Sequence, residues 1–555
     1  MNFKLMYDNP DENLLTRLFK VRGIDDNIDS FLDPKLSEYR WDPFLLNDME
    51  KAVDRIIHAI KHNEKIMIFW DYDVDGITSS YILYRCITKY LNYKNVSIQY
   101  PDRAQDGYGL KKYHIDDIKG KNVNLIITVD NGITSIPEIA YAKQLGIDVI
   151  ITDHHQQLSQ LPEAVAVITP LVSPNYPFKG LAGVGVAFKL ICALLEKSKL
   201  TKDKKNQIFN YFLPIVAIGT VADVVPLLHE NRCMVKRGLE LINKKPENLP
   251  SSLKWFLKYL NLKDNIDTFH IGFVIWPRIN AGGRIQSPYD SLKALLYSGD
   301  KQFEHLDKIE EINTERKRLQ EEAFKKAETL IQLNEKILIA TDTDFHEWIV
   351  GIVAGKLTEK YTKPSMVLKI DTKRNIGIAS LRGPEYFNVI EMISSASTLL
   401  ERFGWHKGAG WLTVKLENLE KLIQRFQDHC NACIEDAYLI KTINVDTKIY
   451  PHERENNILS QIQCLAPFGQ WNAEPLLLLE DVRINKIEKV WSNGKSHLKI
   501  HGEFGDKKVG CMFRWKGKEI EDGKLIWDSK TINIVGKIKK DTYNGWYFVD
   551  VADIS

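Results

Sequence analysis

The sequence predicts a multidomain α/β protein. A mostly parallel-sheet domain, a long connecting helix and a second α/β domain precede a C-terminal β-barrel. Three observations support this fold class. Short β-rich runs alternate with helical patterns in the first half, a strongly charged helical segment begins near residue 300, and short strands with Gly and Asn turns follow residue 440. At 555 residues the chain is long enough for several domains.

Residues 1–50 are polar with few apolar anchors, and we expect a helical lead-in there. The first domain is expected over 51–300. Strands joined by helices run parallel and are covered on both faces, so each forms a near-continuous apolar run. The predicted strands are 65–70, 96–100, 125–129, 149–152 and 164–168, with helices such as 79–91 and 136–145 between them and a buried helix at 212–223.

The later part of the chain divides into three further segments. Residues 301–335 are dense in Glu and Lys, as expected of a long solvated helix that connects two domains. A second α/β domain is predicted over 336–438, with strands at 336–340, 365–368 and 376–380 and helices near 348–361 and 389–403. The short strands over 439–555 predict a small β-barrel or sandwich.

Composition narrows the class of protein. A formal net charge of +2 and a pI near 8.0 neither demand nor exclude a polyanionic partner. The seven cysteines are dispersed, which fits reduced thiols in a cytosol, and we expect the Cys430-x-x-Cys433 pair on a helix face packed inward. The sequence lacks a positive-then-apolar leader and any run near ~18 apolar residues, so we expect a cytoplasmic protein without membrane association.

The most informative motif is a set of three aspartates, Asp71, Asp73 and Asp75, that follows the apolar run at 66–70. If that strand continues through them, their carboxylates point to one side of the sheet. Such a cluster repels itself unless a cation neutralises it, and a hard divalent metal with oxygen ligands meets that need. The motif therefore predicts metal chemistry, with phosphate as the substrate.

Further acidic and imidazole side chains follow later strands of the same domain. Asp130 follows the third predicted strand, and Asp153, His154 and His155 follow the fourth. Because the carboxyl ends of such strands line the ligand crevice, we expect these side chains on one rim. Asp223 lies in an apolar stretch, where a carboxylate is costly without a metal or another partner. An Asp-rich set with one His suits Mn²⁺ or Mg²⁺ better than Zn²⁺, and two ions ~3.5–4 Å apart activate water and hold phosphoryl oxygens.

Two further kinds of site contain a similar run of aspartates, and both fit this sequence less well. Asp-x-Asp-x-Asp-Gly also opens a calcium-binding EF-hand loop, but that loop requires Glu at its twelfth position, which is Ile82 here, and a helix before it. A phosphoaspartate-forming hydrolase usually has Thr or Val where Asp75 stands.

Several other segments suggest contact with phosphate or nucleic acid. The segment 278–284 couples Arg278, Asn280 and Arg284 with glycines that permit close approach to a ligand, although a Gly turn with surface arginines is the alternative. The Gly-rich stretch 180–185 precedes a helical pattern that would seat an anion, and close packing explains it equally well. Gly, His and Lys gather at 403–410. Five C-terminal tryptophans among lysines suit stacking on single-stranded bases, although most are expected in the core: Trp471, Trp491, Trp515, Trp527 and Trp546.

Together these motifs resemble the DHH phosphoesterase superfamily and, within it, the exonucleases specific for single strands. The matching segments occur in the family's order: 71–76, 129–132, 152–155, 181–187, 219–227 and 278–284. The resemblance implies a catalytic DHH domain, a connecting helix, a DHH-associated domain and an oligonucleotide-binding (OB) barrel. It also implies hydrolysis of single-stranded DNA from the 5′ end to mononucleotides in DNA repair or recombination, with two Mn²⁺ or Mg²⁺ ions.

The resemblance assigns roles by motif match. Five residues look like the metal ligands: Asp73, Asp75, Asp130, His154 and Asp223. Asp71 and Asp153 are similar to supporting or additional ligands in the catalytic set, and His155 to the residue that contacts the scissile phosphate. The remaining matches imply phosphate or nucleotide contacts for Arg103, Tyr108, Arg278, Asn280, Arg284 and His406.

The chain departs from the family pattern in its substrate-holding half. Trp405 and Trp411 stand where the family has glycines around His406, and Trp471 replaces a Gly within the segment 467–475. Substrate length preference, processivity or polarity can therefore differ from those of the family.

Two alternative functions stay open. The first is a DHH phosphodiesterase of short oligonucleotides or cyclic dinucleotides, which would not need the β-barrel. The second is a non-catalytic single-strand-binding scaffold, which would have lost metal ligands. The family suggests a helicase or single-strand-binding protein as a partner, and we expect a monomer.

Overall fold

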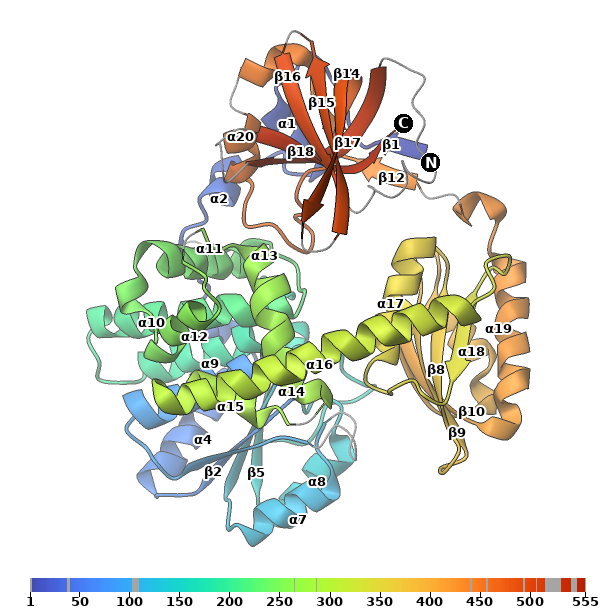
Figure 1. The fold of residues 1–555 in the computed structure, drawn as a ribbon. Coiled ribbons are helices and arrows are strands. Elements are labelled where there is room, and N and C mark those ends of the chain that lie inside the picture. The colour runs from blue at the N-terminus through green and yellow to red at the C-terminus, as the bar shows by residue number, and fades with distance from the viewer. Residues whose placement is uncertain are drawn as a thin grey trace. The chain divides into compact units, whose positions relative to one another are not determined.

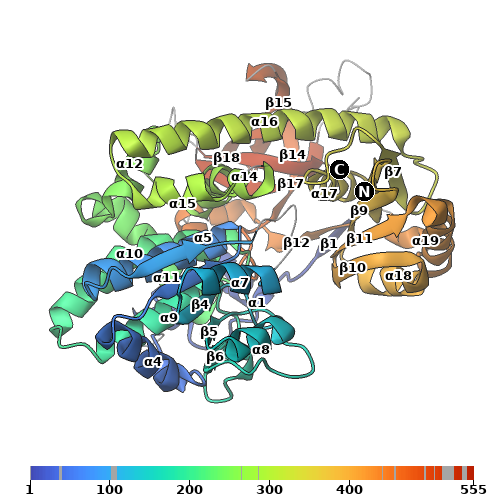
Figure 2. The ribbon, with the colours of Figure 1, turned by 90° about the horizontal axis from the view of Figure 1, so that it is seen from below.

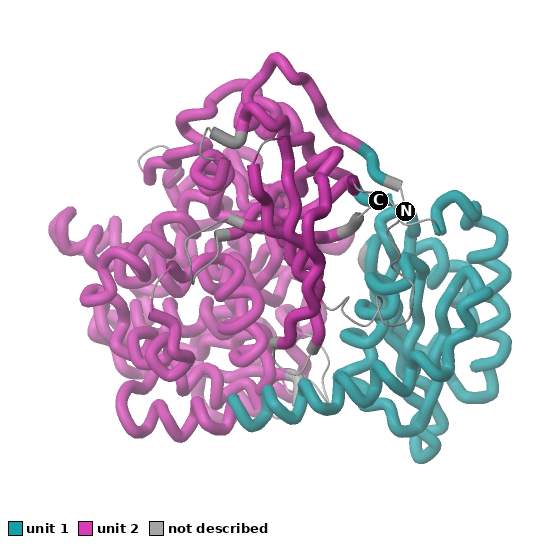
Figure 3. The backbone as a smooth tube through the Cα atoms, turned by 45° about the horizontal axis from the view of Figure 1, so that its top comes forward, with its two compact units in different colours: residues 1–4, 310–443 teal, residues 5–309, 444–555 magenta. Residues whose placement is uncertain are grey.

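The computed structural model describes residues 2–36, 40–101, 109–263, 265–285, 287–439, 442–455, 458–492, 495–505, 507–514, 531–540 and 547–554. The chain forms two compact units, coloured separately in Figure 3: residues 5–309 with 444–555, and residues 1–4 with 310–443. Among the described residues, no helix combines the length and apolar character needed to cross a bilayer.

The first domain is built on a five-stranded parallel sheet of order β3-β2-β4-β5-β6. Its strands are β2 (Ile66–Trp70), β3 (Val96–Gln99), β4 (Leu125–Val129), β5 (Asp148–Thr152) and β6 (Ala166–Ile168). The chain adds β3 on one side of β2 and then returns to place β4 on the other side. The crevice outside the carboxyl ends of β2 and β4 is therefore a topological switch point, where open α/β sheets bind ligands.

Helices cover both faces of this sheet (Figures 1 and 2). Ile68 and Trp70 of β2 lie in a large core with α4 (Met49–Lys61), α5 (Val74–Arg85) and α9 (Gly183–Glu196). Met67 and Phe69 point to the other face, where α7 (Lys112–Gly120) and α8 (Ile136–Gln144) close a smaller core. Because both faces are covered, all five residues of β2 are buried, which explains its continuous apolar sequence.

A helical layer completes the first domain. It contains α10 (Lys202–Ala222), α11 (His229–Lys244), α12 (Ser251–Tyr259), α13 (Thr268–His270), α14 (Trp276–Ile285) and α15 (Tyr289–Leu296). Helix α10 packs against α5, α9 and α11. The buried helix predicted at 212–223 is the C-terminal half of α10, and Asp223 is its C-cap residue. A π-helical turn at Ile271–Ile275 joins α13 to α14.

The predicted charged helix is α16 (Asp300–Leu330), which is continuous in Figure 1. Its first turns place Leu306 and Ile309 in the core of the first domain. Its last turns place Ala327 in a core of the second α/β domain. The helix is polar because it connects two domains and contributes side chains to a core only in stretches near its two ends.

The second α/β domain has a sheet of order β10-β11-β9-β8-β7, in which β7 and β8 are parallel and the other pairs antiparallel. Its strands are β7 (Leu338–Asp342), β8 (Ser365–Asp371), β9 (Ile376–Arg382), β10 (Leu400–His406) and β11 (Ala409–Lys415). Its helices are α17 (Val350–Tyr361), α18 (Val389–Ser395) and α19 (Leu419–Cys433). Cys430 is buried in this domain, whereas Cys433 is exposed.

The helix predicted at 389–403 is wrong in its second half, because α18 ends at Ser395 and β10 begins at Leu400. Serines and a threonine over 394–398 compete for backbone hydrogen bonds and weaken a helix, whereas the aromatic residues that follow favour a strand. Strand β10 pairs with β11 from Leu400 to His406.

The C-terminal strands form a closed five-stranded barrel in the order β14-β15-β16-β18-β17, and β14 pairs with β17 to close it. The bounds are β14 (Leu477–Ser492), β15 (Lys495–Phe504), β16 (Lys507–Phe513), β17 (Thr531–Lys540) and β18 (Tyr547–Ile554). A short strand, β13 (Thr447–Lys448), adds to β14, and α20 (Ile458–Cys464) precedes the barrel. Trp471 and Trp491 are exposed, and Trp515, Trp527 and Trp546 lie outside the described residues.

The N-terminal segment is more than the helical lead-in that the sequence predicts. Strand β1 (Asn2–Leu5) pairs with β12 (Thr442–Val445). Helix α1 (Leu14–Val21) places Leu18 in the core of the barrel, and its buried Arg17 forms a 2.8 Å ion pair with Glu453. A second short helix, α2 (Ile28–Leu32), follows. The first residues of the chain thus complete a domain that is otherwise formed by the last ones.

Candidate metal centre

The three aspartates after β2 lie on a turn from strand to helix. Strand β2 ends at Trp70, so Asp71, Asp73 and Asp75 do not alternate along a strand as predicted. Instead, Asp73 caps α5 by accepting a hydrogen bond from the Gly76 amide at 3.0 Å, and Asp75 lies in the first turn of the helix. A Cβ atom on Gly76 would lie 2.2 Å from the Asp71 carbonyl oxygen, so the turn requires glycine.

Five further residues reach the same place from other elements. Asp130 follows β4 in the left-handed conformation (φ 60°), and Asp153, His154 and His155 follow β5. The Nε2 atom of His154 lies 3.1 Å from an Asp130 carboxylate oxygen. The same nitrogen lies 3.8 Å from Asp75 and 3.5 Å from Asp223, which arrives from the end of α10. The rim predicted from the strand ends is therefore present, and the helical layer contributes Asp223 to it.

Among the residues that the structure describes, potential ligand atoms form three overlapping groups, each with its atoms within 4.8 Å of one another. The groups are Asp75 with His154 and Asp223, Asp71 with Asp73 and Asp130, and Asp130 with His154 and His155. Because Asp130 belongs to two groups and a carboxylate can bridge two cations, the arrangement fits two neighbouring cations that share Asp130.

The Gly-rich stretch at the start of α9 orients one of these carboxylates. The amides of Gly183 and Val184 donate to the two oxygens of Asp75 at 2.6 Å and 2.8 Å. The anion seated at this helix N-terminus is thus a side chain of the protein itself. The sequence analysis did not assign this role to the two amides. The glycines next to an apolar helical pattern were the feature that could have indicated it.

Burial and mutual repulsion oppose ionisation of the clustered carboxyl groups. Burial and the charge of Asp73 raise the pKa of Asp75 to about 7, even though its two amide hydrogen bonds favour the charged form. Burial, followed by the charges of Asp75 and Asp73, also raises the pKa of Asp130 and of Asp223 well above the usual range. A bound cation reverses this balance, because it stabilises the ionised carboxylates.

The two adjacent histidines have opposite protonation states. Burial and the charge of His155 lower the pKa of His154 to about 4, so His154 is neutral and its Nε2 can act as a ligand. Burial alone would lower the pKa of His155, but its 2.8 Å hydrogen bond to Asp153 and the nearby carboxylates outweigh burial and raise it to about 9. Asp153 also accepts hydrogen bonds from the amides of Ile133, His154 and His155.

The donor set fits Mn²⁺ or Mg²⁺. Carboxylate oxygens dominate it, with one neutral imidazole, as these hard cations prefer. Nε2 of His154 and one carboxylate oxygen of Asp223 are buried and make no hydrogen bond within the described part of the chain. Buried polar atoms are normally satisfied, so these two atoms are explained if they face a metal ion.

The segment with Arg278, Asn280 and Arg284 is helix α14, not the Gly-rich loop that the sequence suggests. Gly283 serves contact with the aspartate turn, since a Cβ atom on it would lie 2.3 Å from the Tyr72 carbonyl oxygen. Asn280 is buried, and the guanidinium of Arg278 donates to the Val274 carbonyl at 2.8 Å. The side chain of Arg284 lies outside the described residues.

The side chains of the other predicted contacts with substrate lie outside the described residues. Arg103 and Tyr108 lie outside the described residues. His406 is the last residue of β10, and its side chain is likewise outside the described part. The β10–β11 hairpin pairs Gly404 with Trp411, whose ring lies against the glycine, with Nε1 2.6 Å from an added Cβ position.

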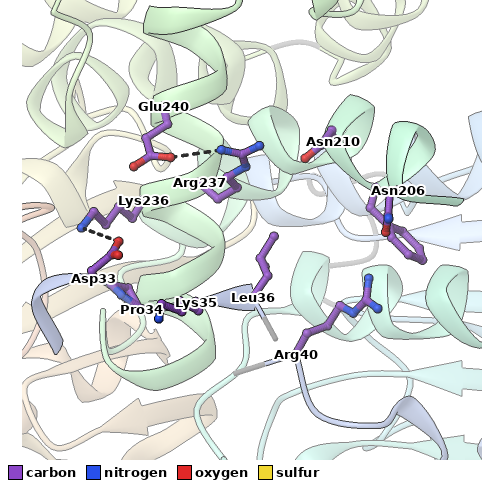
Figure 4. A pocket seen from close by; sticks show the side chains of 11 residues that line it. Asp33, Pro34, Lys35, Leu36, Arg40, Asn206, Asn210, Lys236, Arg237 and Glu240 are labelled. Atoms are coloured by element: carbon purple, nitrogen blue, oxygen red, sulfur yellow. Dashed lines mark hydrogen bonds and ion pairs between the residues drawn. The ribbon is translucent and has the colours of Figure 1, made fainter. Parts of the chain in front are cut away.

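A cavity of about 390 Å³ elsewhere in the first domain carries several cationic side chains (Figure 4). Lys236 faces Asp33 at 3.8 Å, and Arg237 faces Glu240 at 3.2 Å. Arg40 lies over the ring of Phe209, 4.7 Å from its centroid. Because carboxylates pair two of these cations, we assign this cavity no role in binding an anion.

Comparison with known proteins agrees with this architecture. The model of the DHH family N-terminal domain matches residues 65–220, and the RecJ OB domain model matches residues 445–551. The chain is similar to the single-stranded-DNA-specific exonuclease RecJ of Bacillus subtilis, with 33% identity over 96% of this chain and 66% of that protein. It thus spans just under two thirds of the length of that relative.

Two further similarities extend over most of both chains. The single-stranded-DNA-specific exonuclease RecJ of Salmonella typhimurium is 31% identical over 82% of this chain and 81% of its own length. The structure of RecJ from Thermus thermophilus in complex with Mn²⁺ covers 98% of this chain and 75% of that chain, with a TM-score of 0.81 and 24% identity. The latter similarity confirms the predicted fold class, and the former establishes the family. The chain therefore belongs to the RecJ family of DHH-domain proteins.

Proposed function

We propose that this protein is a metal-dependent exonuclease that hydrolyses single-stranded DNA from the 5′ end to mononucleotides, in DNA repair and recombination. The observation that carries the proposal is the convergence of Asp75, Asp130, Asp223 and His154 at the switch point of the parallel sheet. A closed barrel of the oligonucleotide-binding type belongs to the same compact unit. A metal centre next to such a barrel suits a long polynucleotide better than a small phosphate ester.

The residues at the centre divide the chemical work. When bound, two Mn²⁺ or Mg²⁺ ions supply an activated water and neutralise charge on the phosphoryl oxygens. Asp73, Asp75, Asp130, His154 and Asp223 would hold them. The remaining side chains of the cluster orient these ligands or face the substrate.

In this proposal, His155 contacts the scissile phosphate. Its side chain is 37% exposed, whereas that of Asp153 is fully buried, so the ring stands between the protein interior and solvent. Asp153 accepts a hydrogen bond from the Nδ1 atom and so fixes the orientation of the ring. With a pKa of about 9, the ring is cationic at neutral pH and favours the negative charge that develops on the phosphoryl group. Asp71 adds negative charge near the ring and a further oxygen donor.

One experiment tests the assignment. Single-stranded DNA and RNA labelled at either end are incubated with the protein in Mn²⁺, in Mg²⁺ and with chelator. We expect DNA labelled at the 5′ end to release labelled mononucleotide at once, whereas 3′-labelled strands shorten progressively. The His154→Ala variant should be folded and inactive. Full activity of that variant, or release that begins at the 3′ label, would contradict the proposed ligand set or polarity respectively.

Cellular context follows from the same proposal. A single-strand exonuclease needs a source of unpaired DNA, so a helicase or a single-strand-binding protein is the expected partner. We propose that the protein acts as a monomer in the cytoplasm.

A further inference from the structure

Trp471 combines two features that a structural residue avoids. Its backbone lies in the left-handed region, with a φ of 64°, and its side chain is 72% exposed. A bulky residue in this region is strained. A tryptophan that stays exposed buries little apolar surface, so it adds little hydrophobic stabilisation to offset that strain. Backbone strain of this kind concentrates at functional sites. Glycine adopts this conformation without strain, so the backbone does not require tryptophan here.

Hydrogen bonds of the neighbouring residues fix the turn that carries Trp471. Gly469 and Asn472 exchange backbone hydrogen bonds at 2.9 Å and 3.1 Å, with Trp471 between them. The buried amide of Asn472 donates to the carbonyls of Leu465 and Pro467 at 2.8 Å and 2.9 Å. These contacts fix the backbone on both sides of the tryptophan, so its ring projects from a preorganised support.

The first domain provides the rest of this support. Arg232 of α11 is buried and donates to the carbonyls of Leu465, Ala466 and Pro467 at 2.9–3.2 Å. Arg22, which ends helix α1 of the N-terminal segment, also donates to the side chain of Asn472 at 3.1 Å. The turn therefore moves with the domain that carries the metal centre.

A short loop connects the turn directly to a metal-ligating residue. The chain leaves Asp223 and reaches Leu227, whose amide donates to the Gln470 carbonyl at 2.9 Å. Four residues span at most about 14 Å, which limits the separation between Asp223 and Leu227. Val224, the first residue of this loop, is also exposed and left-handed, with a φ of 58°. Strained, exposed apolar residues thus begin and end the path from the metal centre to the turn.

We propose that Trp471 stacks on a base of the single-stranded substrate, a few nucleotides from the phosphate at the metal centre. This inference rests on the proposed function. An exposed indole ring next to an oligonucleotide-binding barrel offers the sequence-tolerant stacking surface that single strands need. A glycine at this position would let the backbone approach phosphate, whereas tryptophan exchanges that contact for one with a base.

The test measures binding of 3′-fluorescein-labelled oligothymidylate to the full-length chain by anisotropy, with Ca²⁺ in place of Mn²⁺. A series of oligonucleotides carries one abasic site at successive positions. For the parent protein, we expect a loss of about tenfold in affinity when the abasic site lies at the stacked position. The Trp471→Gly variant should bind the intact strand about tenfold more weakly and lose the penalty at that position.

Matched variants separate stacking from backbone strain. Trp471→Asn removes the ring and tolerates the left-handed conformation, so it should behave like Trp471→Gly. Trp471→Tyr keeps an aromatic face and should retain most of the affinity. Melting temperatures of the Gly and Asn variants should equal or exceed that of the parent, which excludes misfolding as the cause of weaker binding.

Two results would overturn the inference: Trp471→Gly binds the intact strand as tightly as the parent protein, or it keeps the same loss of affinity for the abasic strand. The exposed ring would then be assigned to contact with a protein partner. Activity of the parent in Mn²⁺ is measured in parallel. If the parent degrades single strands but shows no position-dependent abasic penalty, stacking fails and the proposed function stands. If the parent neither binds nor degrades them, the proposed function fails.

Discussion

Replacing Asp130 by Asn separates the effect of a buried charge from that of the backbone. Asp130 has a φ of 60°, a conformation that Asn tolerates as well as Asp. Its carboxyl group is buried, and the neighbouring carboxylates raise its pKa further. The substitution therefore removes a repulsive charge without adding strain, whereas alanine would add a left-handed penalty of about 1–2 kcal/mol.

The sign of the effect follows from proton linkage. A carboxyl group whose pKa is higher in the folded state holds its proton more tightly there, so stability falls as pH rises between the unfolded and folded pKa values. For Asp75 these values are 3.8 and about 7. The difference corresponds to a destabilisation of about 4 kcal/mol above pH 7 in the metal-free protein. Asp130 shares the same repulsion, so we expect Asp130→Asn in chelator at pH 8 to unfold at the same temperature as the parent or higher.

With bound metal, the parent should have a higher melting temperature than Asp130→Asn, which is the reverse of the order expected in chelator. A cation at about 100 times its dissociation constant stabilises the parent by about 2.7 kcal/mol. For a domain of this size, that gain raises the melting temperature by about 5–10 °C. The Asn variant lacks a carboxylate that two of the three ligand groups share, and we expect most of this increase to be lost.

The assay is thermal unfolding of both proteins at pH 5 and pH 8, with chelator and then with excess Mn²⁺. Asp54→Asn is the control, because Asp54 is an exposed residue of α4 and should leave the Mn²⁺ response unchanged. The Mn²⁺ response of the parent should be smaller at pH 5, where protons compete for the carboxylates. A full Mn²⁺ response in Asp130→Asn, or a lower melting temperature of that variant in chelator, would refute the reasoning.

Two further predictions test the surroundings of the metals. Asp153→Asn removes the partner that raises the pKa of His155. The alkaline limit of kcat/KM should therefore move from near pH 9 towards neutral pH. A limit that does not move would show that another group titrates there. Gly283→Ala should push α14 away from the Tyr72 carbonyl, cost about 1–3 kcal/mol in unfolding free energy and weaken the Mn²⁺ response. Gly272→Ala is its control, because an added Cβ atom there meets nothing within 4 Å, and equal effects of the two changes would contradict the argument.

The sequence was informative about the metal centre because strand ends carry their own signal. A buried parallel strand appears as a continuous apolar run, and polar residues directly after it must lie at its carboxyl end. This reasoning placed Asp130 and His154 on one rim without knowledge of the strand order. It failed for Asp73 and Asp75, because Gly76 lets the chain turn into a helix directly after Trp70. Their convergence depends on that turn and not on the alternation of a strand.

Contacts between distant segments left no comparable signal. The pairing of buried Arg17 with Glu453 joins residues at opposite ends of the chain, and each residue alone looks like a surface charge. The glycines of α14 suggested a ligand loop, although Gly283 serves contact with a turn more than 200 residues earlier. Local patterns predict elements and their ends, whereas such contacts depend on which surfaces the fold brings together.

The loop after α10 connects the metal centre of the first domain to the turn that precedes the barrel. Asp223 needs a position fixed to within a fraction of an ångström, because a shift of its carboxylate alters its distances to Asp75 and His154 in their common ligand group. Leu227 and Arg232 anchor the same part of the chain to the turn below Trp471. A base stacked on that ring would therefore be positioned by the backbone that also positions a metal ligand. If Trp471 stacks on a base as proposed, substrate binding and metal geometry are coupled through one short loop, and that coupling would account for the strained conformations at Val224 and Trp471.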